Sequence, residues 1–123
     1  MYERAKTRKL SNAIVGYFFR HHITNVDVRI RMDDDKTDIT VEGYTEHSIE
    51  GIEGLCERTY NTRRVEFEDT YDELLGIRDS DDEMELIGYL VDEAHVYFGN
   101  NKLAFNVVRY RRQGFDPAPH GKL

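Results

Sequence analysis

Apolar and polar residues alternate with a helical period near the start of the chain and with a strand period directly afterwards. Between residues 3 and 22 the apolar positions are three and four apart, which predicts an amphipathic helix. Its expected buried face consists of Leu10, Ala13, Ile14, Tyr17, Phe18 and His21. From residue 26 the period falls to two, which predicts a strand with one buried face. The apolar positions of this strand are Val26, Val28, Ile30 and Met32.

A second alternating run follows after a short polar connection. Ile39 and Val41 alternate with Thr40 and Glu42, and the residues DDDK at 33–36 separate this run from the first. Two alternating runs joined by a short polar segment predict a β-hairpin.

The middle of the chain is less regular. The apolar residues of the segment 46–61, EHSIEGIEGLCERTYN, share one side of an expected helix: Ile49, Ile52, Leu55 and Cys56. Cys56 is interpreted as a buried structural thiol. Residues 62–79 leave two alternatives open, because VEFE suits a short strand whereas TYDELLGI suits one or two helical turns.

The last third of the chain predicts a long helix and a third strand. Ser80 and Glu83 have the Ser-x-x-Glu spacing of a capping box, in which each side chain satisfies a backbone N–H of the first turn. The helical face that follows consists of Met84, Ile87, Leu90, Val91, Ala94 and Phe98. Gly99 and Asn100 suit a left-handed helix end. The third strand is expected at the alternating positions Leu103, Phe105 and Val107.

The order of these elements predicts an α/β fold. Short antiparallel strands and long amphipathic helices bury their apolar faces in a two-layer α/β sandwich, a mostly antiparallel sheet covered on one face by helices. The chain of 123 residues is long enough for one domain, which we expect over residues 1–113. Residues 114–123 contain both prolines and are expected to form a flexible tail.

Composition narrows the expected location and the class of partner. The sequence lacks the apolar run of a membrane span and the apolar core of a signal peptide, so we expect a cytoplasmic protein without a membrane partner. The net charge is −7, although residues 1–31 and 95–123 carry +5 and +4. Because phosphate contacts need clustered Lys and Arg, an acidic chain is a poor candidate for nucleic-acid binding.

Clusters of metal-ligating residue types have structural explanations. His21 and His22 are adjacent, and neighbouring helical residues diverge by about 100 degrees, so this pair does not form a metal-binding face. Asp33, Asp34 and Asp35 lack the central glycine and the closing glutamate of a calcium loop and are expected to form a solvated turn. No serine lies in a Gly-x-Ser-x-Gly turn. We therefore predict neither a metal site nor a catalytic residue.

Two stretches resemble the GHKL ATPase fold, which histidine kinases, anti-sigma-factor kinases and gyrase share. The segment RKLSNAIVGYFFRHHITNVDVRIRMDDDKTDITVEG, at 8–43, resembles the asparagine-box helix and its following hairpin. The segment MELIGYLVDEAHVYFGNNKLAFNVVRYR, at 84–111, resembles the last helix and strand of the anti-sigma kinase form. The resemblance leaves residues 44–79 largely unmatched.

The resemblance implies three nucleotide-site residues, of which this chain matches one. The asparagine of the family's box coordinates the magnesium ion that bridges the nucleotide phosphates, so Asn12 is the candidate ligand for Mg-ATP. The family's catalytic carboxylate corresponds to Arg8, which stays protonated and cannot act as a base. The aspartate that contacts adenine corresponds to Gly43, and the adjacent Glu42 points to the opposite face of the strand.

The family's phosphate-binding glycines correspond to the acidic segment DSDDEMEL at 79–86. The resemblance implies small residues there, because backbone N–H groups approach the phosphates. Asp81, Asp82 and Glu83 instead suit the dipole of the following helix but repel a triphosphate. We therefore expect a degenerate scaffold that has lost its nucleotide chemistry and holds no cofactor.

The aromatic residues of the first helix are the candidate interaction residues. Tyr17, Phe18 and Phe19 are consecutive and cannot all face one core, so at least one is expected at the surface, where it suits a dimer interface or a partner groove. Packing within the molecule is the other explanation. The first hypothesis is a non-catalytic, bacterial-type regulatory domain that binds a protein partner or a second copy of itself. The alternatives are an active Mg-ATP-binding kinase or ATPase of the anti-sigma type and a nucleic-acid-binding module with an unrelated α/β fold.

Overall fold

The computed structural model describes residues 2–46, 66, 68–75 and 83–111, and these residues form helices packed on a single sheet. The elements in chain order are α1 (Tyr2–Arg20), β1 (Val26–Met32), β2 (Lys36–Tyr44), α3 (Glu68–Leu74), α4 (Glu83–Leu90), β3 (Glu93–Gly99) and β4 (Lys102–Tyr110). Residues 47–61 of the expected helix, the cap residue Ser80 and the expected tail over 114–123 lie outside the described residues.

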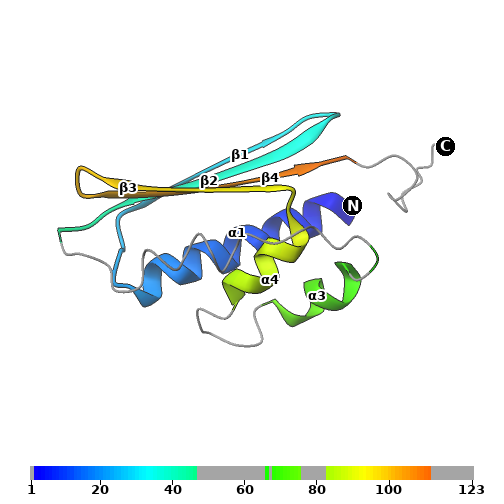
Figure 1. The fold of residues 1–123 in the computed structure, drawn as a ribbon, viewed down its shortest axis with the longest axis horizontal. Coiled ribbons are helices and arrows are strands. Elements are labelled where there is room, and N and C mark those ends of the chain that lie inside the picture. The colour runs from blue at the N-terminus through cyan, green and yellow to red at the C-terminus, as the bar shows by residue number, and fades with distance from the viewer. Residues whose placement is uncertain (1, 47–65, 67, 76–82, 112–123) are drawn as a thin grey trace.

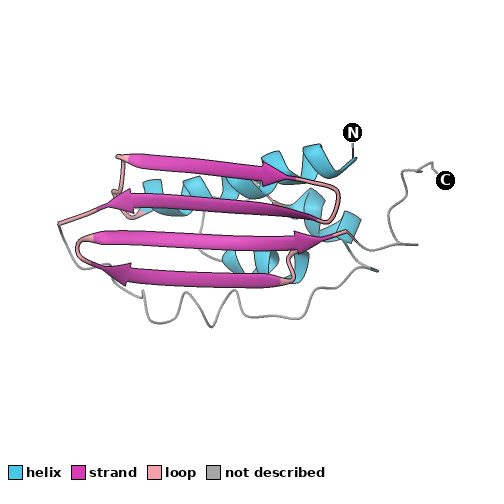
Figure 2. Cartoon of the chain, turned by 90° about the horizontal axis from the view of Figure 1, so that it is seen from above, coloured by secondary structure: helices cyan, strands magenta, loops and turns pink. Residues whose placement is uncertain are grey.

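The four described strands form one antiparallel sheet in the order β1-β2-β4-β3. All the labelled helices lie on the same face of this sheet, and the other face carries no labelled element (Figure 1). From above, β2 and β4 lie in the middle of the sheet and β1 and β3 form its two edges (Figure 2). The expectation of a two-layer α/β fold with an antiparallel sheet is therefore confirmed. None of the described helices has the length and apolarity that crossing a membrane requires.

The first helix forms where its period predicts it and ends in a left-handed cap. His22 has φ 64°. The Ile23 N–H donates to the Phe18 carbonyl at 2.9 Å, and the His22 N–H donates to the Phe19 carbonyl at 3.0 Å. This is the Schellman arrangement, which also brings the side chains of Ile23 and Phe18 together. Both are fully buried, so the cap fixes the exit from α1 into β1.

The predicted first hairpin is confirmed, with Ile30 opposite Ile39 and Val28 opposite Val41. An aspartate stabilises its turn, because Asp33 Oδ1 accepts hydrogen bonds from the backbone N–H groups of Asp35 and Lys36, both at 2.9 Å. Such aspartate turns are a common way to reverse the chain. The acidic run at 33–35 therefore has the structural role that its sequence predicts.

The long helix predicted from Met84 to Phe98 is wrong beyond Leu90. Helix α4 ends at Leu90, and the next residues form the edge strand β3. The expected helix end is a hairpin turn, in which Asn100 and Asn101 have φ 55° and 61°. Positive φ at both central residues is typical of a type I′ turn, whose twist suits a tight hairpin. The β3 residues then gain cross-strand partners, such as Val96 opposite Phe105, that a helix does not offer.

The core lies between the sheet and the helices. Its fully buried side chains come from α1, α4 and the two middle strands, with one from the α1–β1 connection: Leu10, Ile14, Tyr17, Phe18, Ile23, Ile39, Val41, Met84, Ile87, Leu90, Leu103, Phe105 and Val107. A buried ion pair between Arg109 and Glu3 joins the sheet to the helix layer near the start of α1. Arg109 is 2% exposed and donates to both carboxylate oxygens of Glu3 at 2.8 and 3.0 Å, and to the Leu90 carbonyl at 2.5 Å. Paired donation to a carboxylate also fixes its geometry, so this contact orients α1 on β4.

Candidate interaction surface

The apolar row of the edge strand β1 is exposed, although it faces the helix side of the sheet. Val28, Ile30 and Met32 are 43%, 45% and 37% exposed. Residues that lie opposite one another in an antiparallel pair share a face, so Val28 and Ile30 lie on the same face as the buried Val41 and Ile39. The apolar residues of this strand therefore lie on the face that the alternation predicts, but the expectation that Val28, Ile30 and Met32 are buried is wrong. We call Val28, Ile30 and Met32 the β1 row.

The backbone of the β1 row points to the unpaired edge of the sheet. The Asp33 N–H donates to the Lys36 carbonyl at 3.0 Å, which fixes the phase of the β1–β2 ladder. Since hydrogen-bonded pairs alternate in an antiparallel ladder, Asp27, Arg29 and Arg31 exchange hydrogen bonds with β2. The N–H and C=O groups of the β1 row consequently point outward, where the described strands provide no neighbour.

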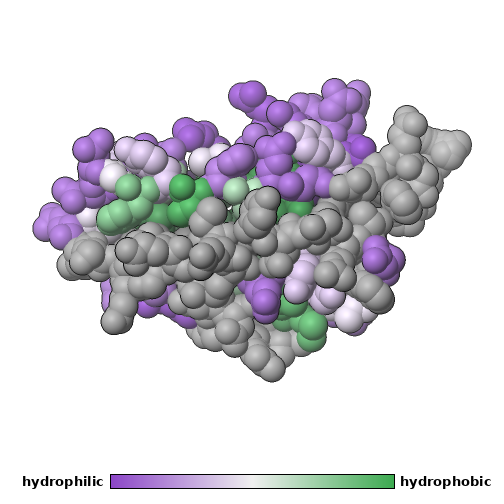
Figure 3. Space-filling view, viewed as in Figure 1, coloured by the Kyte–Doolittle hydropathy of each residue, from purple (hydrophilic) through white to green (hydrophobic). Residues whose placement is uncertain are grey.

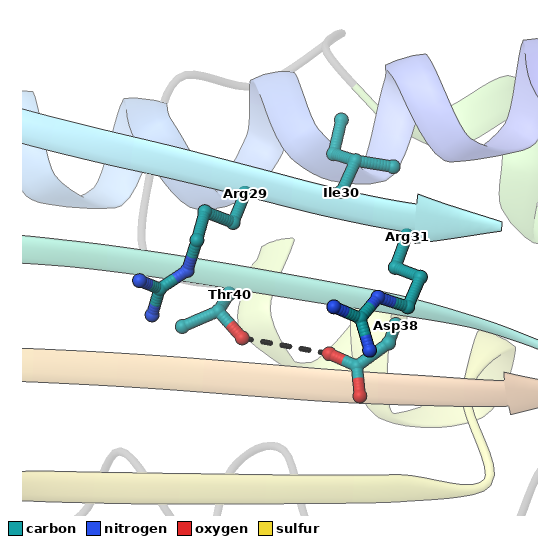
Figure 4. Close-up of a pocket in the computed structure, with 5 residues that line it drawn as sticks. All are labelled: Arg29, Ile30, Arg31, Asp38 and Thr40. Carbon is teal, nitrogen blue, oxygen red and sulfur yellow. Dashed lines mark hydrogen bonds between the residues drawn. The ribbon is translucent and has the colours of Figure 1, made fainter.

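The opposite, open face of the sheet is hydrophilic. Seen with β3 in front, hydrophilic residues cover the top of the molecule, and hydrophobic residues form a band where the sheet meets the helices (Figure 3). Near β1 this open face has a shallow hollow of about 470 Å³. The residues that line the hollow are Arg29, Ile30, Arg31, Asp38 and Thr40 (Figure 4).

The side chain of Asn106 fixes two residues that line this hollow, Asp38 and Thr40. Asn106 donates through Nδ2 to Asp38 Oδ1 at 2.8 Å and to Thr40 Oγ1 at 2.9 Å. Arg29 and Arg31 reach from β1 toward these residues, and the side chain of Ile30 points away from them (Figure 4). Arg29 contacts Glu42 at 3.3 Å, and its side chain is 71% exposed. Because exposed ion pairs are weak, the guanidinium group of Arg29 can exchange partners at little cost.

A second polar group lies on the open face between β3 and β4. Tyr110 Oη donates to Glu93 Oε2 at 2.5 Å, and His95 Nε2 lies 3.1 Å from Glu93 Oε1. The Tyr110 and His95 hydrogen bonds lower the pKa of Glu93, whereas donation to this carboxylate raises the pKa of Tyr110. Each shift therefore moves the pKa of its group further from neutral pH. Neither change suits proton transfer near neutral pH.

A further hollow, of about 520 Å³, lies where the α1–β1 connection meets the β3–β4 turn. It contains all the described non-glycine residues with positive φ, namely His22, Asn100 and Asn101. The helix cap and the type I′ turn account for these conformations. The Thr45 N–H donates to the Asn101 carbonyl at 2.8 Å and joins β2 to the turn. The hollow is thus a junction of structural turns.

The structure separates the three predicted interaction residues. Tyr17 and Phe18 are fully buried, so they cannot offer their rings to a partner, and their expected role as contact residues is corrected. The core accepts both because α1 contacts β2 on one side and α4 on another. Phe19 is 54% exposed and remains a candidate contact residue. Asn12 and Arg8 are exposed on α1, so the predicted magnesium ligand is accessible.

Gly43, the position at which the GHKL resemblance implies an adenine-contacting aspartate, lies against the core. A Cβ atom at this position would be 2.5 Å from Ile23 Cγ2 and 3.0 Å from Phe18 Cδ2. Real Cβ atoms do not approach other carbon atoms so closely, so a larger side chain requires the helix cap to shift. The packing of α1 on β2 therefore requires glycine at the position where the resemblance implies an aspartate.

Comparison of the chain with protein-family models, with curated proteins and with solved structures gives no match. Within the ranges that the structure describes, no three His, Cys, Asp or Glu side chains gather as a metal ion needs. The candidate site is therefore built from the geometry alone. The sequence pattern identifies the apolar residues of the β1 row but does not show that they are exposed, because their exposure depends on the strand order.

Proposed function

We propose that this chain is a non-catalytic regulatory domain that binds a polypeptide along the edge of β1, on a degenerate histidine kinase-like ATPase scaffold. The observation that carries the proposal is the β1 row, in which exposed apolar side chains and outward backbone groups belong to the same residues. An added strand satisfies both, because its backbone continues the ladder and its side chains cover the row. Unprotected edge strands are otherwise a route to aggregation.

The packing around Gly43 supports the loss of nucleotide chemistry. The position of the adenine-contacting aspartate has no space for a side chain, since Ile23 and Phe18 fill it. Arg8 occupies the position of the catalytic carboxylate and stays protonated. Asn12 alone retains a residue type that the nucleotide site needs, and one amide oxygen is a weak magnesium site without further ligands.

A photo-crosslinking amino acid at position 30 tests the proposal in the cells that make the protein. We expect irradiation to give a covalent adduct from position 30, because a bound strand lies against the β1 row. Position 8 is the matched control, since Arg8 is also exposed but belongs to helix α1 and not to the edge strand. Adducts are measured by gel mobility and mass spectrometry. Absence of an adduct at position 30, or equal adducts at both positions, contradicts the proposal.

A further inference from the structure

The charges of β1 identify the chemistry of its partner. On its open-face side the strand carries one acid followed by two bases: Asp27, Arg29 and Arg31. A strand that pairs with β1 must therefore present a base opposite Asp27 and an acid opposite Arg29. Read in the antiparallel direction, β1 itself has this order.

We propose that the partner of β1 is a second copy of β1, paired antiparallel about a two-fold axis that passes through Val28. This inference rests on the proposed function and names its partner. Opposite residues share a face only if both have the same parity, so the axis must pass through a residue and not between two. Within Val26–Met32, axes at Val28, Arg29 or Ile30 leave at least five residues of the strand paired. Pairing between identical surfaces closes after two copies and does not propagate into a fibre.

The charges favour the register centred on Val28. In this register Asp27 lies opposite Arg29 of the second copy, and the symmetry creates this pair twice. A register centred on Arg29 places two guanidinium groups opposite each other, and one centred on Ile30 places Arg29 opposite Arg31 of the second copy. Like charges directly opposite one another destabilise a strand pair. Only the Val28-centred register avoids every such contact among these residues.

Backbone geometry agrees with the same register. The outward N–H and C=O groups belong to the even-numbered residues of β1, so the hydrogen-bonded pairs across the axis are Val28 with Val28 and Val26 with Ile30. The intervening Asp27–Arg29 pair is then a non-hydrogen-bonded pair, in which side chains lie closer. Apolar residues meet on the helix side, and opposite charges meet on the open side. The two sheets continue into one, with the helices of both copies on the same face.

The Arg29 side chain is free to make the new contact. Its Nη2 atom lies 3.3 Å from Glu42 Oε2 within one copy, and its side chain is 71% exposed. Glu42 also lies 3.7 Å from Lys102 Nζ, so it retains a cation when Arg29 turns to the second copy. The pairing therefore leaves Glu42 with a charged neighbour.

Charge exchange across the axis tests this pairing by analytical ultracentrifugation of the full chain. We expect D27R and R29D each to weaken self-association by on the order of tenfold, because each converts both attractive pairs into repulsive ones. An equimolar mixture of the two variants restores association, since every cross-axis pair is then opposite in charge. The double variant D27R/R29D also regains self-association. Circular dichroism and thermal unfolding check that each variant is folded.

Single cysteines test the register independently of charge. In a Cys56→Ala background, Val28→Cys places two thiols across the axis at a Cα separation of about 5.5 Å, within the range that a disulfide accepts. We expect oxidation to give a covalent dimer. Ile30→Cys is the control, because the register separates the two copies of residue 30, and it becomes cross-linked only when mixed with Val26→Cys.

Each outcome supports or overturns the pairing. Self-association of R29D at wild-type strength, with loss of association in D27R, indicates an Arg29-centred register and contradicts the proposal. A wild-type chain that remains monomeric at millimolar concentration, with no disulfide at position 28, also overturns it. If position 30 then crosslinks to a different protein, the proposed function stands and only the choice of partner fails.

Discussion

Strands β1 and β2 pair residue by residue and carry the same alternating pattern, yet they differ in how much of that pattern is buried. Ile30 is 45% exposed, and Ile39 directly opposite is 1% exposed. Val28 is 43% exposed, and Val41 opposite is fully buried. The difference arises because β2 lies between two strands and packs against α1. Strand β1 pairs with only one described strand, β2, and forms the edge of the sheet.

This difference shows that the alternation of apolar and polar residues along a strand does not determine whether its apolar face is buried. A period of two assigns side chains to faces, and it does so correctly for both strands. Whether a face is covered depends on the strand order and on the position of the helices, which local sequence does not encode. An exposed apolar row on an edge strand is consequently a property of the assembled sheet, and it is the main reason to expect a partner there.

The largest expected effect is the difference in stability lost when Ile39 and Ile30 are each replaced by alanine. Ile39→Ala removes a fully packed side chain and leaves a cavity, so we expect the free energy of unfolding to fall by about 2–5 kcal/mol. Ile30→Ala removes the same atoms from the same face of the neighbouring strand, but we expect a loss below about 1 kcal/mol because water already reaches the site. Urea denaturation at low protein concentration measures both without a contribution from self-association.

One result for Ile39→Ala and Ile30→Ala would contradict the difference in burial between β2 and β1. Equal losses in the two variants mean that another part of the molecule covers Ile30 in solution. The β1 row is then part of the core, and the proposed interaction surface loses its basis. A common slope of free energy against urea concentration confirms that both variants unfold from the same kind of native state.

Sequence patterns predicted α1 and the first hairpin because each has one clear period over its whole length. The second hairpin was missed because Leu90, Val91, Ala94 and Phe98 satisfy helical spacing by coincidence. A signal for the hairpin was present in the pair Asn100–Asn101, since asparagine tolerates positive φ and two such residues suit a type I′ turn. That pair lies between two runs of period two, so the turn chemistry predicts the strand better than the periodicity does.

The candidate site was less accessible to sequence reasoning than the fold. The three consecutive aromatics correctly indicated a surface residue, but only Phe19 is exposed, because helix α1 is buried across a wide arc. The residues of β1 were assigned a buried face. No local pattern identifies an edge strand, and the strand order β1-β2-β4-β3 follows from long-range pairing of β2 with β4.

A smaller effect is expected at the glycine of β2. Gly43→Ala places a Cβ atom 2.5 Å from Ile23 Cγ2, so we expect a loss of about 1–3 kcal/mol as the cap of α1 shifts. Gly16→Ala is the matched control, because its Cβ meets only Arg20 Nη1 at 3.4 Å and alanine favours a helix by about 0.5–1 kcal/mol. The two substitutions should thus change the melting temperature in opposite directions. A neutral Gly43→Ala contradicts the close packing of α1 on β2.

The smallest expected effect concerns the turn that sets the register of β1 against β2. Hydrogen bonds from the backbone N–H groups of Lys36 and Asp35 hold the pKa of Asp33 below its usual value. A lowered folded-state pKa stabilises the protein above the unfolded-state value, near pH 4, and this stabilisation is lost as the pH falls through the folded-state pKa. Asp33→Asn keeps an acceptor for the turn but does not titrate. We therefore expect Asp33→Asn to lose less stability than the wild type between pH 6 and pH 2, as measured by urea denaturation across that range. An identical pH dependence in both proteins means that the Asp33 turn does not form in solution, and the alignment of Ile30 with Ile39 then depends on the strand pairing alone.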